Sequence, residues 1–227
     1  MFTAPLDTIL LFMTTMPLVG WISAKIHFPK LRDGYALLGF ALTSWFLLAL
    51  YGQVREKGVV MEAHFLPWGS SLEIDALSIF MTSAFLLLGF TATLFSVRYM
   101  EEETGLTEYY TLVLGMIAGM IGLVFAGDFL TFFLFWELMS ITSYVLVAFR
   151  KRSKAAVEAS YKYLIMSGGG AMMLAYALSL IFGITGTLNF AFIRASVAES
   201  GYDPWLRIAL AMTVVGFGVK AAVVPLH

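Results

Sequence analysis

Residues 129–149 read FLTFFLFWELMSITSYVLVAF, and Glu137 is the only charged residue among them. At 1.5 Å per residue, a helix of about 20 residues crosses the hydrocarbon core of a bilayer. Glu137 would then lie near the middle of the membrane, where a charged side chain costs at least about 2.5–3.5 kcal/mol. An acid kept at such a cost normally has a partner or a function, so Glu137 is the first candidate site residue.

The composition of the whole chain indicates a membrane protein. Of the 227 residues, 60% are hydrophobic and 13% are charged, and the mean hydropathy is +0.86. Soluble domains are about 45–50% apolar and 25% charged, so one globular core could not bury this surplus. We therefore expect an all-α polytopic membrane protein. The net charge of -1 gives no electrostatic reason to expect nucleic-acid binding.

Seven apolar stretches are long enough to span a bilayer. Between Val59 and Phe65, apolar and polar side chains alternate instead, and Pro67 follows, which predicts a short hairpin near residues 59–73. A short surface helix is expected around Leu188–Ala198. The seven stretches are expected at about 6–24, 34–54, 75–97, 108–127, 129–149, 157–183 and 205–225.

The lysines and arginines predict the orientation of these spans, because cytoplasmic loops carry an excess of them. One side holds Lys25, Lys30, Arg32, Arg98, Arg150, Lys151, Arg152 and Lys154. The other side holds only Arg55, Lys57, Arg194 and Arg207. The first side is expected to be cytoplasmic, with the N-terminus and the 59–73 hairpin outside. The expected location is the prokaryotic cytoplasmic membrane.

Glu137 is expected to have hydroxyl neighbours on its own helix. Residues three and seven positions further on share its face, and these are Ser140 and Tyr144. A buried carboxyl group is stable either when protonated or when ionised beside a cation. A group that exchanges between these forms could relay a proton. The alternative is a static buried ion pair that fixes helix packing.

Lys220 is the second candidate, because it lies inside the apolar stretch 208–225, with Thr213 on the same helix face. A nearby carboxylate favours the charged form of a buried amine. The alternative is a lysine that reaches the membrane interface, which would require a broken helix, and Pro225 makes such a break plausible. His227 could titrate near neutrality or be an ordinary terminal residue.

Three further polar features occur near these helices. Asp128 precedes the Glu137 helix and is expected to cap it. Lys162 either anchors the sixth helix at the interface or forms the cytoplasmic end of a proton path. The segment 167–170 reads SGGG, and its small residues predict a close approach of neighbouring helices.

Several classes of chemistry are not expected. The chain has no cysteine, which excludes disulfides, cysteine-ligated iron–sulfur clusters and thiol catalysis within it. His27, His64 and His227 show no metal-ligand spacing. A self-contained redox enzyme is therefore not expected, and neither is a cofactor or metal bound by this chain.

Five motifs carry a resemblance to a known family. They are IDALS at 74–78, GDFLTFFLFWELMS at 127–140, EASYKYLI at 158–165, TGTL at 185–188 and GVKAAVVPLH at 218–227. Together they resemble the antiporter-like membrane subunits of respiratory complex I, of multi-subunit cation/proton (Mrp-type) antiporters and of membrane-bound hydrogenases. The first seventy or so residues add only compatible hydropathy.

The resemblance implies a fourteen-helix fold with two inverted five-helix repeats, of which this chain holds about seven helices. Residues 1–106 would form helices 1–3, and residues 107–227 would form helices 4–7 of the first repeat, ending inside the broken helix 7 where relatives continue. In that family a glutamate of helix 5 pairs with a lysine of helix 7, and Glu137 and Lys220 occupy those positions. The expected proton-translocation residues are Glu137, Lys220, His227 and Lys162, supported by Ser140, Tyr144, Thr213 and Pro225.

The expected function is a proton- or sodium-translocating membrane subunit that couples redox chemistry in other subunits to ion pumping. Its partners would be other membrane subunits, peripheral redox subunits and the lipid bilayer. One alternative is a subunit of a multi-subunit Na+/H+ antiporter without redox activity. Another is a membrane scaffold that transports nothing.

Overall fold

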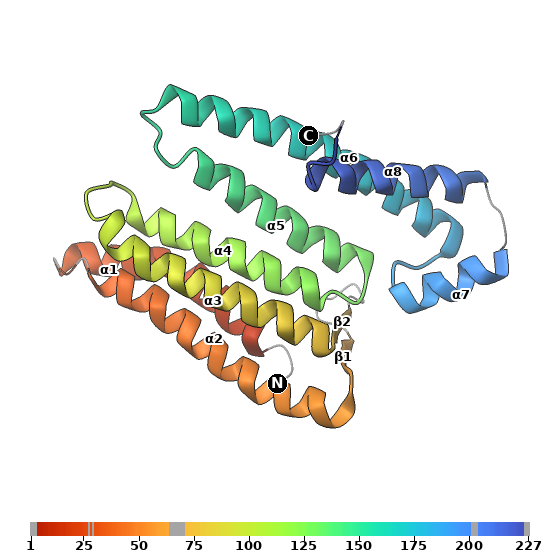
Figure 1. Ribbon diagram of the computed structural model, residues 1–227, viewed down its shortest axis with the longest axis horizontal. Coiled ribbons are helices and arrows are strands. Elements are labelled where there is room, and N and C mark those ends of the chain that lie inside the picture. Colours follow the sequence, from red (N-terminus) through yellow and green to blue (C-terminus); the bar gives the residue numbers. More distant parts are fainter. Residues whose placement is uncertain (1–3, 27, 29, 64–70, 201–203, 225–227) are drawn as a thin grey trace.

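The computed structural model describes residues 4–26, 28, 30–63, 71–200 and 204–224 (Figure 1). Pro225 and His227, both expected at the site, lie outside the described residues. The described part forms eight helices and one two-stranded sheet. The elements are α1 (Ala4–Lys25), α2 (Lys30–Lys57), β1 (Val60–Ala63), β2 (Ser71–Ile74), α3 (Ala76–Tyr99), α4 (Leu106–Phe125), α5 (Phe129–Val147), α6 (Lys154–Thr185), α7 (Phe190–Ser200) and α8 (Pro204–Lys220).

Six of the seven expected spans are present as helices long and apolar enough to cross a membrane, namely α1 to α6. The chain is therefore a multi-pass membrane protein. The seventh stretch differs from the expectation, because α8 has 17 residues and ends at Lys220, five positions before Pro225 (225 − 220 = 5). The amide of Ala221 still bonds to the carbonyl of Phe217, but Ala222 adopts a φ of 51° and the chain leaves the helix.

The helices form two groups joined by α5. Helices α1 to α4 pack against one another, α5 packs on α4, α6 packs on α5, and α8 packs on α6. Figure 1 shows α5 between the α1–α4 group and the α6–α8 pair. The core of the first group includes Phe40, Tyr110 and Phe125, which are fully buried. Large side chains such as Trp45 and Phe80 point outward instead, as expected for a surface that faces lipid tails.

Small residues on α4 let α5 approach closely. A Cβ atom at Gly119 would lie 2.7 Å from the backbone nitrogen of Met139, and one at Gly122 would overlap the ring of Phe135. Membrane helices gain little from the hydrophobic effect when they associate, so such close van der Waals packing holds them together. The glycines of α4 therefore help to fix the position of α5, which carries Glu137.

The end of α5 near the sheet is tied down by loops. Strands β1 and β2 pair antiparallel, with Val60 opposite Ile74. This pair lies where the alternation of side chains predicts a hairpin. The location of the hairpin on the extracytoplasmic side of the membrane stays a prediction. The amide of Gly127 donates to the carbonyl of Ser71 at 2.9 Å. The predicted surface helix is α7, which begins two residues later than expected.

Replacing Gly119 with alanine should destabilise the protein. The new methyl group would meet the backbone of α5, so the two helices must move apart, at a cost of about 1–3 kcal/mol. Gly52→Ala is the matched control, because Gly52 also lies within a helix but a Cβ atom there would meet no neighbouring group within 4 Å. Thermal unfolding in detergent measures both. Equal melting temperatures for the two variants would contradict the close packing of α4 on α5.

Asp75 should contribute a pH-dependent part of the stability. Its carboxylate caps α3 by accepting from the backbone nitrogen of Ser78 at 2.7 Å and from the Ser78 hydroxyl at 2.8 Å. The Ser78 backbone N–H lowers the pKa of Asp75 below its ordinary value. The ionised form therefore stabilises the fold above the unfolded pKa of about 3.9, and this contribution is lost as the pH falls through the lowered pKa.

Asp75→Ala is accordingly expected to cost roughly 0.5–2 kcal/mol near neutral pH and less in acid. Asp75→Asn is the control, because asparagine caps about as well as aspartate and does not titrate. Unfolding measured in detergent over a pH series tests this. A cost of Asp75→Ala that does not change with pH would argue against the ionised cap.

Candidate functional site

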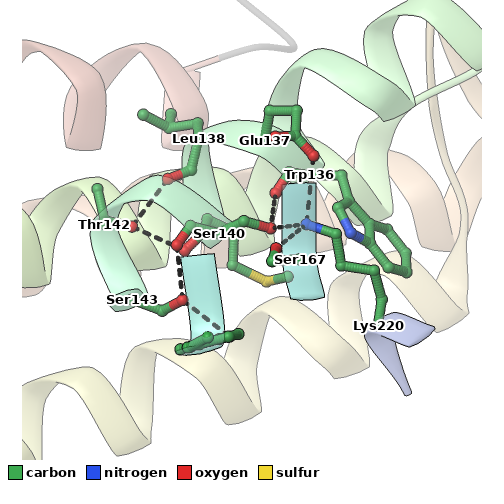
Figure 2. Close-up of polar contacts among 10 residues, drawn as sticks. Trp136, Glu137, Leu138, Ser140, Thr142, Ser143, Ser167 and Lys220 are labelled. Atoms are coloured by element: carbon green, nitrogen blue, oxygen red, sulfur yellow. Dashed lines mark hydrogen bonds and ion pairs between the residues drawn. The ribbon is translucent and has the colours of Figure 1, made fainter. Parts of the chain in front are cut away.

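Glu137 and Lys220 meet inside the helix bundle, 83 positions apart in the chain. The Nζ atom of Lys220 lies 3.2 Å from Oε1 of Glu137, 2.6 Å from Oγ of Ser140 and 2.6 Å from Oγ of Ser167 (Figure 2). The Lys220 side chain is 6% exposed and that of Glu137 is 28% exposed. An ammonium group has three hydrogens to donate, and these three oxygens accept all of them. We call the four residues the lysine cluster.

Helix α5 supplies two of the three oxygens. Glu137 and Ser140 are three positions apart, so they share a helix face as predicted. The Ser140 hydroxyl donates its hydrogen to the carbonyl of Trp136 at 2.7 Å. That bond leaves the lone pairs of the hydroxyl to accept from Lys220, so the backbone of α5 fixes Ser140 as an acceptor.

The start of α5 is held by Asp128. Its carboxylate accepts from the backbone nitrogen of Thr131 at 2.8 Å, from the Thr131 hydroxyl at 2.7 Å and from the backbone nitrogen of Ser71 at 2.7 Å. The predicted cap is confirmed. Asn189 of the α6–α7 link also donates to the Ser71 hydroxyl at 3.1 Å. The amide of Phe129 also donates to the carbonyl of Leu188 at 2.9 Å, so the segment around Asp128 joins β2, α5 and the α6–α7 link.

The third oxygen comes from α6, and glycines make this possible. A Cβ atom at Gly170 would lie 3.0 Å from Cβ of Val219, and one at Gly216 would lie 3.0 Å from the carbonyl oxygen of Gly170. The close approach of α6 and α8 brings Lys220 to Ser167. Gly170 thus makes the close helix contact expected of the SGGG segment, whereas a Cβ atom at Gly168 or Gly169 would meet nothing within 4 Å.

The other predicted site residues whose side chains are described make different contacts. Tyr144 packs edge-on to Tyr163, with ring centroids 6.3 Å apart, and Thr213 donates to the carbonyl of Ala209 within α8. Lys162 pairs with Glu158 at 2.5 Å, and both side chains are well exposed. Among the described residues, none of Tyr144, Thr213 and Lys162 makes a hydrogen bond to Lys220.

Sequence reasoning did not identify Ser167 as a partner of Lys220. Its contact depends on the register of α6 against α8, which no local pattern reveals. The available signal was a hydroxyl group beside three glycines in a membrane helix, since a polar side chain at that depth needs a partner.

The lysine cluster can hold a proton in an apolar environment. Burying an ion pair is costly unless good geometry and further hydrogen bonds compensate, and the two serines supply those bonds. A neutral amine still has N–H groups to donate, so Ser140 and Ser167 can accept from Lys220 in either protonation state. Among the described residues, no group of three or more acidic or histidine side chains could hold a metal ion.

Six spanning helices and a buried lysine–carboxylate pair define a polytopic membrane protein with an ion pair inside its helix bundle. Residues 126–227 match the family described as "NADH:quinone oxidoreductase/Mrp antiporter, TM". Residues 62–110 match "NADH-Ubiquinone oxidoreductase (complex I), chain 5 N-terminus". The chain belongs to the family of antiporter-like membrane subunits that these two descriptions cover.

Similar proteins are known from bacteria and archaea. The chain is 32% identical to the NADH-quinone oxidoreductase subunit N of Desulforamulus reducens, over 88% of this chain and 40% of that protein. It is 29% identical to the F(420)H(2) dehydrogenase subunit N of Methanosarcina mazei, over 84% of this chain and 40% of that protein. The chain thus spans less than half the length of these relatives.

Solved structures of similar fold come from three kinds of complex. Respiratory complex I from Thermus thermophilus with bound aureothin contains a chain with a TM-score of 0.72 and 26% identity, over 98% of this chain and 45% of that one. A chain of the Mrp complex from Dietzia has a TM-score of 0.81 and 25% identity, over 100% of this chain and 42% of that one. A chain of an archaeal membrane-bound sulfane sulfur reductase has a TM-score of 0.89 and 24% identity, over 100% of this chain and 46% of that one. At this identity the likeness shows a shared fold alone.

Replacing Ser167 with alanine should weaken the lysine cluster. One ammonium hydrogen would lose its acceptor in a buried place, which costs about 1–3 kcal/mol. Ser44→Ala is the control, because the Ser44 hydroxyl only donates to a carbonyl within its own helix, that of Phe40. Unfolding of the purified protein in detergent measures the difference.

The same comparison in a Lys220→Met background isolates the contact. Without an ammonium group, Ser167→Ala should cost no more than Ser44→Ala, and the difference between the two backgrounds gives the coupling energy of Ser167 with Lys220. An equal cost of Ser167→Ala with and without Lys220 would disprove the coupling.

Proposed function

We propose that this chain is a proton- or sodium-translocating membrane subunit of a complex I-like or membrane-bound hydrogenase-type respiratory complex. The single observation that carries the proposal is the buried Lys220 ammonium, held by Glu137, Ser140 and Ser167. Intramembrane ionisable groups that pair with one another mark ion and proton pathways. The names of the similar proteins support the redox context, because they are subunits of NADH-quinone oxidoreductase and F(420)H(2) dehydrogenase.

In this proposal, Glu137 controls the proton on Lys220. While the carboxylate lies beside the amine, the ammonium form is compensated. If Glu137 moves away or takes up a proton, the ammonium keeps only the two neutral hydroxyl partners in a poorly solvated place. Release of the proton is then favoured, and return of the carboxylate favours uptake. Ser140 and Ser167 hold the amine within reach in both states.

The end of α8 supports a movable lysine. Lys220 is the last residue of α8, and the chain turns away at Ala222. A residue at a helix end can shift with the adjoining segment without disrupting a continuous helix. Irregular backbone at membrane depth is tolerated where protein surrounds it. We therefore propose that α8 corresponds to the broken helix 7 of the family, with the break directly after Lys220.

The other assignments follow from this role. Lys162 lies five positions before Ser167 on α6, toward the basic link Arg150–Lys154, and would serve the cytoplasmic end of the path. His227 would continue the path beyond Lys220. We propose that the chain works with other membrane subunits and with peripheral redox subunits, and carries no cofactor itself. It would lie in the prokaryotic cytoplasmic membrane with its N-terminus outside.

A multi-subunit Na+/H+ antiporter is the second candidate. It is favoured by the likeness to a chain of the Mrp complex, with a TM-score of 0.81 over the whole of this chain. The lysine cluster would serve in the same way, but the driving force would be an ion gradient. Copurification of flavin, iron–sulfur or nickel subunits from native membranes would favour the redox complex, and their absence from an intact complex would favour the antiporter.

Glu137→Gln and Lys220→Met should slow ion translocation in the native complex. Loss of a charge-assisted hydrogen bond costs about 1.5–3 kcal/mol, so a decrease of roughly tenfold to hundredfold is expected. Translocation is measured in membrane vesicles against the rate of the driving reaction. Glu56→Gln, which replaces an exposed acid at the end of α2, should change the rate less than twofold.

The outcome also separates the proposal from the scaffold alternative. Complexes that assemble normally and pump at the parental rate with Glu137→Gln and Lys220→Met would disprove the translocation role. Loss of assembly before any loss of pumping would instead favour a structural role for the ion pair.

A further inference from the structure

A large cavity lies at the end of the molecule opposite the sheet. Its volume is about 1320 Å³, and it is bordered by α1, by the α3–α4 turn and by the α5–α6 link. Figure 1 shows this turn and this link at the same end of the bundle. Pockets for drug-sized ligands measure about 300–1,000 Å³, so this cavity could hold a larger molecule. Neither the lysine cluster nor the proposed function uses it.

The lining of the cavity is divided into an apolar part and a charged part. The apolar part comes from the sides of spanning helices and includes Trp21 of α1, Leu112 of α4 and Val145 of α5. The charged part comes from the α3–α4 turn, the first turn of α4 and the α5–α6 link. A molecule that fills the cavity must therefore be apolar toward the membrane and polar toward the link.

The boundary between the two parts lies at the level of the membrane interface. The Nζ atom of Lys25 lies 5.0 Å from the centre of the Trp21 ring, which is a cation–π contact. Tryptophan is enriched where the hydrocarbon core meets the head groups. The apolar part of the cavity thus faces the level of acyl chains, and the charged part faces the level of head groups.

The charged part of the lining presents both positively and negatively charged side chains to a ligand. Arg150 is already satisfied, because its Nε lies 2.9 Å from Oε1 of Glu103 and its guanidinium lies over the Tyr99 ring. Four other charged side chains line the cavity and are exposed, namely Glu102, Glu108, Lys151 and Arg152. Within the part of the chain that the structure describes, no ion pair joins any of these four. They leave two cations and two carboxylates available at one rim.

We propose that this cavity binds a phospholipid whose head group carries both a phosphate and a primary amine. The phosphate would lie against Lys151 and Arg152, since phosphate oxygens accept charge-assisted hydrogen bonds. The ammonium group would lie against Glu102 and Glu108, and the acyl chains would run along Trp21 and Val145. A simple anion would leave both carboxylates unpaired, and a soluble ligand would leave the apolar wall bare.

A bound lipid would add contacts between the two helix groups at this end of the molecule. The cavity is lined by α1, α4, α5 and the start of α6, so a molecule within it touches both helix groups at this end. At the opposite end, the segment around Asp128 joins β2, α5 and the α6–α7 link. Lipid binding should therefore raise the melting temperature of the protein.

The test uses purified, delipidated protein in detergent with three added lipids. Phosphatidylethanolamine should raise the melting temperature, phosphatidylglycerol should raise it less because it has no amine, and diacylglycerol should not raise it. A Lys151→Gln/Arg152→Gln variant should bind phosphatidylethanolamine at least about tenfold more weakly, a change that corresponds to about 1.4 kcal/mol. Lys154→Gln is the matched control, because Lys154 is the exposed first residue of α6, directly after the basic link, and does not line the cavity.

A second variant tests the acidic half of the site. Glu102→Gln/Glu108→Gln should weaken the binding of phosphatidylethanolamine. It should leave the binding of phosphatidylglycerol unchanged or make it tighter. The proposal is wrong if all three lipids raise the melting temperature equally, or if Lys154→Gln weakens binding as much as the double variant. It is also wrong if a unique cysteine introduced as Thr104→Cys, at the cavity wall, crosslinks to a partner subunit in the native complex and lipid does not block that reaction.

Discussion

A primary amine buried among apolar helices needs a hydrogen-bond acceptor for each of its hydrogens, because no water replaces a missing one. This requirement governs the second half of the structure. Lys220 finds its acceptors on two different helices, so α5, α6 and α8 must meet at one place and in one register. Glycines at the α4–α5 and α6–α8 contacts make that meeting possible, since any side chain there would hold the helices apart.

The ion pair was predictable because each of its members violates the hydropathy of its own segment. Glu137 and Lys220 can each be recognised without knowledge of any contact, and Ser140 follows from helical spacing. Ser167 could not be found in this way, since its role depends on how α6 is placed against α8. The two helix groups could not be predicted from the sequence either, because α1 to α6 are similarly apolar and hydropathy does not say which helix faces are in contact.

The end of α8 shows a second limit of local reasoning. Residues 221–224 are Ala-Ala-Val-Val. Their hydropathy predicts that the membrane helix continues through them, and alanine is the best helix former. The helix nevertheless ends at Lys220. Proline predicts a break nearby, but not its position. Lys162 lies inside a predicted span, but hydropathy does not say which way its side chain points, and in the structure it is exposed beside Glu158.

The cap at Asp128 has a mechanical consequence for the ion pair. It fixes the start of α5 to β2 and to the α6–α7 link, whereas the other end of α5 leads into an exposed basic link. The rest of α5 is also held, because the Ser160 hydroxyl of α6 donates to the carbonyl of Tyr144 at 2.7 Å and Gly119 of α4 packs against Met139. Glu137 lies nine residues from Asp128, about 13 Å along the helix axis at 1.5 Å per residue. The cap thus sets the depth of Glu137 relative to the sheet, and a change in the Glu137–Lys220 distance would come from the end of α8 at Lys220 rather than from α5.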